Sequence, residues 1–269
     1  MQFTYYQSSA IGSRRVNEDR IAHSYKRDAL LLVVADGMGG HPDGECAADI
    51  CVRLFVEQFR REAMPVIRNP FGFLRDSMAR AHDAVRSYAN QLSMPESPGT
   101  TCVACVVQAG VAHWVHCGDS RLYLFRQGKL LRETEDHSHL QRLINFGLVG
   151  SGDDASSARN LLFSCLGGPT KPTIDVGHAP LLHADVLLLS TDGFWSVVTK
   201  QEIADSLSTL PVREAAPGLV TIAEQRGRPL GDNVSAIFVG WGPEEAGRAE
   251  PPGATGTQIE MALQAGVSR

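Results

Sequence analysis

The segment ALLLVVADGMGGHPDGE (Ala29–Glu45) holds an apolar run, an aspartate and a glycine-rich turn, in that order. The apolar run, Ala29 to Ala35, is too short to cross a membrane and is flanked by turn-forming residues, so it predicts a buried β-strand. Asp36 follows this run directly, and four glycines come within the next eight residues. A carboxylate in this place is held from behind by the strand and faces a cleft in front, which makes Asp36 a candidate for chemistry.

Further carboxylates lie at the ends of other expected strands. Asp192 follows the apolar run DVLLLST, Asp119 follows VAHWVHCG, and Asp232 comes just before NVSAIFV. Glu18 and Asp19 come just before RIAHSY. Taken singly, an aspartate beside a glycine is usually a turn former or a cap. Taken together, these residues predict several negative charges at one edge of the fold.

Such a cluster of carboxylates needs neutralisation. Two like charges about 4 Å apart repel by about 4 kcal/mol at an effective dielectric of 20. Either some carboxyls keep their protons or divalent cations bind between them. Oxygen ligands without cysteine or histidine suit Mg²⁺ or Mn²⁺ better than Zn²⁺. Two such ions would balance four carboxylates.

The periodicity of the chain predicts an α+β fold. Helical spacing of apolar residues covers 45–59, where Asp43 and Gly44 are expected to cap the start, and the segment after Pro70. Four short extended runs between 100 and 133 predict an antiparallel meander. Further strands are expected at 3–12, 20–25, 173–179, 185–190 and 233–241, with helices at 137–146, 200–210 and 212–225. This order favours a four-layer αββα sandwich, two mostly antiparallel β-sheets flanked by helix pairs.

Length and composition set the limits of the fold and its partners. The 269 residues carry a formal net charge of -5, with Lys and Arg scattered rather than gathered, so no nucleic-acid footprint is expected. No signal sequence or membrane-spanning run is found, so we expect no membrane partner and a cytoplasmic location. Residues 1–242 are expected to form one domain. Residues 243–269, rich in Ala, Gly, Pro and Glu, are expected to form a flexible tail, and Gly147–Asn160 a mobile loop.

Two motifs that could indicate metal binding are interpreted as structural. Cys102 and Cys105 form a C-x-x-C, and His113 and His116 have the same spacing. Both pairs lie in extended runs, where side chains three residues apart point to opposite faces. The cysteines are therefore expected to be core thiols, and the two histidines are not expected to bind a metal.

Six motifs together resemble a known family. SRRVNED, VVADGMGGH, GTTCVACVV, GDSR, STDGFW and GDNVSAI have the order and spacing of the metal-dependent protein Ser/Thr phosphatases. This is the PPM or protein phosphatase 2C family, and the match is best with its compact bacterial branch. The resemblance covers roughly Thr4 to Trp241. It implies a β-sandwich of two antiparallel sheets between helix pairs.

The resemblance also implies roles for individual residues. Asp36 is similar to the carboxylate that bridges two metal ions, and the Gly37 carbonyl to a ligand of the first. Glu18, Asp192 and Asp232 match the ligands of the second ion, and Asp119, with Asp192, matches a third, weaker site. Asp19 resembles a residue that orients metal-bound water, and Arg14 the arginine that grips the substrate phosphate. Arg15 is expected to face solvent or form a local ion pair.

The implied reaction is hydrolysis of phosphoserine or phosphothreonine in proteins by direct attack of a hydroxide that bridges two Mn²⁺ or Mg²⁺ ions, without a covalent phosphoenzyme. The implied substrate is a phosphorylated protein, a Ser/Thr kinase or its target. Where animal members carry a histidine as general acid, this sequence has Met38, which cannot donate a proton. His41 lies nearby but is expected to be structural, so the leaving-group acid stays open.

Two other functions remain open from the sequence. A regulatory or binding pseudophosphatase would keep the fold and lose turnover, but every expected ligand is retained. An enzyme with the same metal chemistry could instead act on small phosphomonoesters or nucleic acid, and the lack of a basic surface disfavours nucleic acid.

Overall fold

Two five-stranded antiparallel sheets form the centre of the protein, seen here as a computed structural model that describes residues 1–38, 43–148 and 161–243. The first sheet has the order β1-β10-β9-β6-β7 and the second β2-β3-β4-β5-β8. The first comprises β1 (Phe3–Ala10), β6 (Arg121–Arg126), β7 (Lys129–Glu133), β9 (Val186–Ser190) and β10 (Val234–Trp241). The second comprises β2 (Asp19–Tyr25), β3 (Ala29–Asp36), β4 (Cys102–Gln108), β5 (Val111–Cys117) and β8 (Asp175–Pro180).

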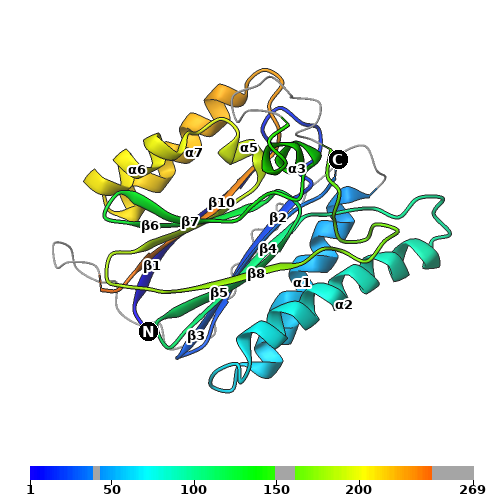
Figure 1. Ribbon diagram of the computed structural model, residues 1–269, viewed down its shortest axis with the longest axis horizontal. Helices are drawn as coiled ribbons and strands as arrows, with labels where there is room; N and C mark the ends of the chain where they lie inside the picture. Colours follow the sequence, from blue (N-terminus) through cyan, green and yellow to red (C-terminus); the bar gives the residue numbers. More distant parts are fainter. Residues whose placement is uncertain (39–42, 149–160, 244–269) are drawn as a thin grey trace, which may run out of the picture.

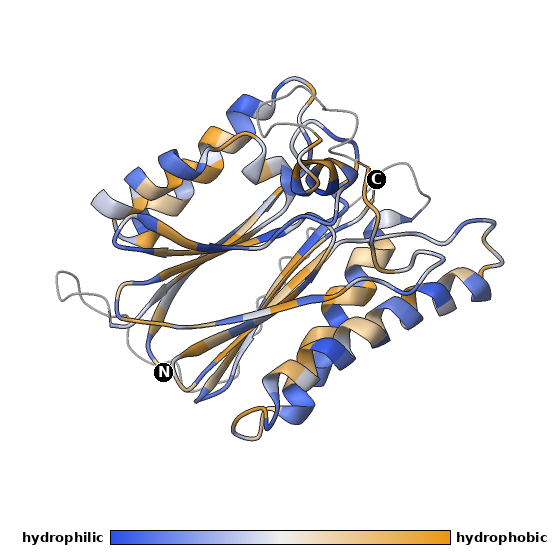
Figure 2. Cartoon of the chain, viewed as in Figure 1, coloured by the Kyte–Doolittle hydropathy of each residue, from blue (hydrophilic) through white to orange (hydrophobic). Residues whose placement is uncertain are grey.

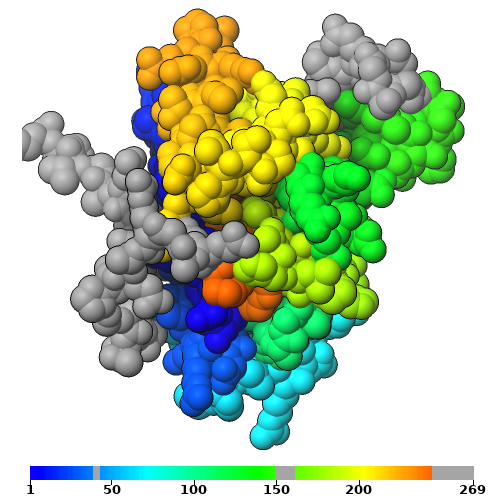
Figure 3. All heavy atoms as spheres, turned by 90° about the vertical axis from the view of Figure 1, so that its left-hand side faces the viewer, coloured from blue at the N-terminus to red at the C-terminus, as the bar shows by residue number. Residues whose placement is uncertain are grey.

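Helices cover the outer faces of both sheets (Figure 1). The long helices α1 (Gly44–Glu62) and α2 (Pro70–Gln91) pack on the second sheet, and α6 (Lys200–Thr209) and α7 (Val212–Gly227) lie over the first. The short helices α3 (His139–Asn145) and α5 (Asp192–Trp195) lie near one end of the sandwich. In the space-filling view of Figure 3, α6 and α7, in yellow and orange, lie at the opposite end from α2, in cyan. The expected four-layer sandwich is confirmed.

Apolar side chains fill three separate layers. Strand β3 explains the arrangement, because Leu31 and Val33 face α1 and α2 whereas Leu30 and Leu32 face the other sheet. Both faces of β3 are therefore covered, which is why its sequence is apolar throughout. A third layer, including Phe238, lies between the first sheet and its helices. In Figure 2 the apolar residues follow the inner sides of helices and strands. Full burial of one such leucine stabilises the fold by about 1.5–3 kcal/mol.

The side-chain directions expected for the two spaced pairs are confirmed. Cys102 packs in the layer beneath α1 and α2, and Cys105 lies between the sheets. His113 contacts the ring of Phe71 on α2, with centroids 5.1 Å apart. His116 packs instead against His137, with centroids 4.6 Å apart. Both cysteines are buried free thiols, as expected.

The expected cap of α1 is wrong in its chemistry. Asp43 does occupy the position before the helix, but its φ of 62° is left-handed and its side chain accepts no capping hydrogen bond. That carboxylate instead accepts a 3.2 Å hydrogen bond from the Tyr88 hydroxyl of α2. Helix α2 is capped conventionally, since the Asn69 side chain accepts from the Gly72 amide and Pro70 begins the helix.

Two remaining expectations concern other parts of the chain. The tail 243–269 lies almost entirely outside the described residues, as does most of the loop Gly147–Asn160. Among the described helices, none is both long enough and apolar enough to pass through a lipid bilayer.

Candidate metal centre

The predicted carboxylates gather where strands of both sheets end. Asp19 and Asp36 are cross-strand partners at the end of the β2–β3 ladder. Asp192 begins α5 directly after β9, and Asp232 comes just before β10. The pKa of Asp36 is raised well above its usual range, first by burial and then by nearby negative charges on Asp19, Asp192, Asp119 and Asp232. Five predicted residues are therefore close enough to interact electrostatically.

The main chain of Asp36 is fixed by two threonines of the segment before β4. Its amide donates to Thr101 Oγ1 at 3.1 Å, and its carbonyl accepts from the Thr101 amide at 2.8 Å and from Thr100 Oγ1 at 2.9 Å. The next residue, Gly37, donates its amide to the Glu18 carbonyl at 3.1 Å. A Cβ at Gly37 would come 2.9 Å from that same carbonyl oxygen, so the close approach requires glycine.

Asp19 has one satisfied and one unsatisfied carboxylate oxygen. Oδ2 accepts from Thr191 Oγ1 at 2.9 Å. Oδ1 is buried and has no hydrogen-bond partner among the described residues. Burial, together with the charges of Asp192 and Asp232, raises the pKa of Asp19 to about 7, although the hydrogen bond from Thr191 opposes the shift. A buried oxygen without a partner is costly, so this atom is suited to contact a cation or to accept a hydrogen bond from an ordered water.

Asp192 and Asp232 belong to the ends of adjacent strands in the first sheet. Burial and the charge of Asp232 raise the pKa of Asp192 to about 6, while a hydrogen bond with Asp36 lowers it. Asp232 Oδ1 accepts from the Asn233 amide at 2.8 Å. Its Oδ2 lies 2.6 Å from Arg14 Nη2, so the predicted phosphate-binding arginine lies at the rim of the centre.

Two glycines lie in close contact with the backbone at Asp232 and Asn233. A Cβ on Gly12, which has a φ of 59°, would collide with the Asp232 carbonyl oxygen. A Cβ on Gly193 would collide with the Asn233 carbonyl oxygen. The segment that carries Asp232 is therefore confined from two sides by backbone.

Asn233 organises the site but was not singled out from the sequence. Its Oδ1 accepts from the Glu18 amide at 2.8 Å, and its Nδ2 donates to the carbonyls of Ile11 and Val16. These bonds fix the turn that carries Arg14 and Glu18. Burial and nearby acidic groups raise the pKa of Glu18. Glu18 is therefore also close to the negatively charged carboxylates. Asn233 follows Asp232 within the GDN motif, and this position was the sequence signal that could have identified it.

A second unpredicted group supports Asp119. Its carbonyl accepts from Trp195 Nε1 at 2.9 Å, and the guanidinium of Arg121 lies 3.5 Å from the centre of the Trp195 ring. Arg121 pairs with Asp136 through two 2.7 Å hydrogen bonds. Burial and the charges of Asp192 and Asp136 raise the pKa of Asp119 well above its usual range. Arg121 and Trp195 each end a recognised motif, whereas no pattern indicated Asp136.

The chemistry of the donors fits hard divalent cations. The carboxylates offer oxygen only, and burial with nearby negative charge raises the pKa values of Asp19, Asp36, Asp119 and Asp192, a shift that a bound cation would oppose. In the part of the chain that the structure describes, no three of these carboxylates bring oxygens within 4.8 Å of one another. The carboxylates are therefore spread around this end of the sandwich rather than gathered at one point.

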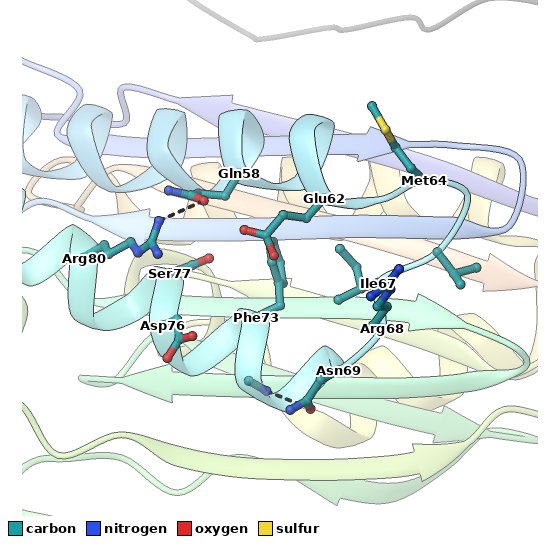
Figure 4. A pocket seen from close by; sticks show the side chains of 12 residues that line it. Gln58, Glu62, Met64, Ile67, Arg68, Asn69, Phe73, Asp76, Ser77 and Arg80 are labelled. Carbon is teal, nitrogen blue, oxygen red and sulfur yellow. Dashed lines mark hydrogen bonds between the residues drawn. The ribbon is translucent and has the colours of Figure 1, made fainter.

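Other features of the surface lie apart from this centre. A cavity of about 430 Å³ opens between the end of α1 and the start of α2 (Figure 4). Its polar wall includes Gln58 and Arg80, joined by a 3.3 Å hydrogen bond, with Glu62 and Asp76 nearby. No predicted site residue lines it. Met38 is described and donates its amide to the Gly99 carbonyl, whereas His41 lies outside the described residues.

Comparison with known proteins gives consistent matches. The sequence profile of the family described as protein phosphatase 2C matches residues 6–222. The serine/threonine phosphatase Stp of Listeria monocytogenes is 30% identical over 230 residues, covering 84% of this chain and 90% of that protein. The serine/threonine protein phosphatase PstP of Mycobacterium tuberculosis is 32% identical over 248 residues, covering 88% of this chain and 45% of that protein.

Solved structures agree with these matches. The crystal structure of Stp1 from Staphylococcus aureus superposes with a TM-score of 0.83 at 25% identity, covering 90% of this chain and 96% of that one. The catalytic domain of PstP in complex with two manganese ions superposes with a TM-score of 0.74 at 28% identity, covering 88% of this chain and 97% of that one.

Proposed function

The chain belongs to the protein phosphatase 2C family, and we propose that its strand-end carboxylates form the catalytic centre of a metal-dependent protein serine/threonine phosphatase. The carrying observation is the convergence of buried carboxylates at one end of the sandwich, where Asp19 and Asp36 are cross-strand partners and Asp192 follows β9. Bacterial relatives named as serine/threonine phosphatases match most of this chain, which supports the same activity here.

We assign the metal ligands as follows. Asp36 would lie between two Mn²⁺ or Mg²⁺ ions, with the Gly37 carbonyl on one ion and Glu18, Asp192 and Asp232 on the other. Asp119, with Asp192, would hold a third ion. When bound, such ions acidify water for attack on phosphorus and offset the charge of the phosphate oxygens. The two manganese ions in the PstP structure support a centre that holds two ions.

Asp19 would orient the attacking water rather than bind an ion directly. Its Oδ2 is committed to Thr191, and its buried Oδ1 is left to accept a hydrogen bond from a water molecule. The Thr191 hydroxyl holds the carboxylate in one orientation. Direct attack by water transfers the phosphoryl group without a covalent intermediate on the protein, so we assign no nucleophilic side chain.

Arg14 would bind the phosphate of the substrate. Its side chain is about half exposed (49%), at the edge of the centre, and its guanidinium is held there by Asp232. The planar guanidinium can donate two parallel hydrogen bonds to two phosphate oxygens, which a lysine cannot. Arg14 would release Asp232 as the phosphate arrives.

The substrate that we propose is a phosphorylated protein, a Ser/Thr kinase or the target of one. The names of the relatives support a phosphoprotein substrate. Nucleic acid is disfavoured, because the formal net charge is -5 and the basic residues are dispersed.

A phosphopeptide assay tests this function. Phosphate release from a phosphothreonine peptide should require Mn²⁺ or Mg²⁺, stop on addition of EDTA and exceed the rate on p-nitrophenyl phosphate at equal concentration. A faster reaction with the small ester than with any phosphopeptide would favour a small-molecule phosphatase. Metal binding without turnover on either substrate would indicate a pseudophosphatase.

A further inference from the structure

A second group of possible metal ligands lies outside the carboxylate centre. His116 of β5 and Asp175, the first residue of β8, are cross-strand partners. His137, from the segment between β7 and α3, packs on His116. One donor atom from each of the three lies within 4.8 Å of the other two. We propose that His116, His137 and Asp175 bind a divalent transition-metal ion, of which Zn²⁺ is the best match.

The hydrogen bonding of His116 suits a metal ligand. Nε2 lies 2.8 Å from the carbonyl oxygen of Glu135, and a carbonyl can only accept, so Nε2 carries the ring proton. The lone pair is therefore on Nδ1, which is buried and has no hydrogen-bond partner among the described residues. The residue is only 4% exposed, so bulk water does not satisfy that nitrogen. Metal-binding histidines characteristically donate their other N–H to a carbonyl in this way.

His137 is held in place by the backbone at Gly118. Its amide donates to the Gly118 carbonyl at 3.0 Å, and its Nδ1 accepts from the Gly118 amide at 3.3 Å. Nε2 is buried, lies 3.4 Å from Asp175 Oδ2 and makes no hydrogen bond within the described chain. When Nε2 binds an ion, the ring proton moves from Nε2 to Nδ1, with no net release. The 3.3 Å hydrogen bond from the Gly118 amide to Nδ1 is then lost. This loss lowers the affinity for the metal, but all three ligands remain.

Asp175 completes the site and opens it to solvent. Its side chain is 56% exposed, whereas the two imidazoles are buried, so an ion can enter from the Asp175 side. Two imidazole nitrogens and one carboxylate oxygen, with a fourth position for water, match Zn²⁺ or Fe²⁺ rather than Mg²⁺. The site shares no residue with the carboxylate centre, which offers oxygen alone. The two centres therefore select different metals.

The position of the site explains why the spacing of His113 and His116 did not reveal it. Those two side chains diverge, as expected, and the partners of His116 come from β8 and from the segment after β7. The pair His113 and His178 occupies an equivalent cross-strand position on the same two strands, with ring centroids 6.3 Å apart. No carboxylate joins that pair in a group of three within the described residues, so it provides an internal control.

Zn²⁺ binding to the full chain tests the proposal. Binding is measured by competition with a chromophoric chelator at saturating Mg²⁺, which occupies the carboxylate centre. Asp175→Asn changes an exposed side chain and should leave the fold intact. It is expected to lower the affinity for one equivalent of Zn²⁺ at least tenfold, because even changes to residues that only support ligands lower metal affinity about 10–100-fold. His178→Gln should leave Zn²⁺ affinity unchanged. Unfolding temperatures of both variants check that they fold.

Co²⁺ gives an independent readout, because its absorption spectrum reports nitrogen ligation in a four-coordinate site. The wild-type and His178→Gln proteins should give the intense bands of such a site, and Asp175→Asn should alter them. His116→Gln should abolish them. Equal Zn²⁺ stoichiometry and affinity in wild type and Asp175→Asn would overturn the proposal, as would Co²⁺ bands that disappear in His178→Gln but persist in Asp175→Asn.

Discussion

Asp19 and Asp36 face each other directly across the antiparallel β2–β3 ladder. Like charges in opposite positions of a ladder destabilise a sheet. Neighbouring strands place further carboxylates, Asp192 and Asp232 among them, at the same end of the sandwich. The pair therefore destabilises the metal-free protein, and a bound cation would offset that cost.

The first prediction concerns the loss of a proposed ligand. Asp192→Asn should lower metal-dependent phosphopeptide hydrolysis at least about 100-fold, a loss at the upper end of that for residues that only support ligands. In EDTA the same variant should unfold at a temperature no lower than wild type, because it removes one buried like charge. Phosphate release and thermal unfolding measure the two effects. Asp205→Asn, on the exposed face of α6, should change neither. An active Asp192→Asn enzyme would refute the assigned role.

The second prediction concerns pH and stability. The pKa values of Asp19 and Asp192, about 7 and about 6, lie above their usual value of 3.8. Between pH 4 and 7 the folded metal-free protein therefore holds protons that the unfolded chain has lost. The stability that this contributes is fully present below about pH 4 and is lost as the pH rises through 6 and 7.

Urea unfolding in EDTA and in excess Mn²⁺ measures this effect. Stability in EDTA should fall more steeply with pH than stability in Mn²⁺, because the metal favours the ionised carboxylates. Taking the difference removes the opposite contribution of buried His82, whose pKa is lowered by burial. Parallel pH profiles with and without metal would contradict the prediction.

The third prediction separates two adjacent arginines. Arg14→Ala should lower kcat/KM for a phosphopeptide by about 10–100-fold, since a hydrogen bond to a charged group contributes about 1.5–3 kcal/mol. Arg15→Ala, at the neighbouring exposed position, should stay within about twofold of wild type. Steady-state kinetics at saturating Mn²⁺ compare the two. Equal losses in both variants would indicate general electrostatic attraction rather than phosphate binding by Arg14.

The fourth prediction concerns the ion pair behind Asp119. Asp136→Ala removes the two shortest hydrogen bonds of the largely buried Arg121 guanidinium and leaves it the longer 3.4 Å contact with Glu133, which should cost about 1.5–3 kcal/mol of unfolding free energy. Arg53→Ala breaks the exposed pair with Asp49 on α1 and should cost no more than about 1 kcal/mol. Chemical denaturation of the metal-free proteins gives both values. Similar costs would mean that Arg121 is effectively solvated.

Strand patterns predicted much of the fold because both sheets are covered on both faces. The buried side of each strand must then be apolar, and the carboxylates stand out where the apolar runs end. Asn233 and Asp136 act through hydrogen bonds to residues far away in the sequence, which a local pattern does not contain. The capping prediction for Asp43 failed for a related reason. Its side chain is directed to Tyr88 of α2, and a left-handed backbone replaces the ordinary cap.

The confinement of Asp232 by Gly12 and Gly193 has a genetic consequence. Neither glycine bears a functional group, yet even a methyl substituent at either position would drive a proposed ligand out of place. Alanine at Gly12 or Gly193 should thus inactivate the enzyme much as loss of a carboxylate does. A saturation mutagenesis screen for activity would then recover these two chemically inert positions among its most intolerant sites.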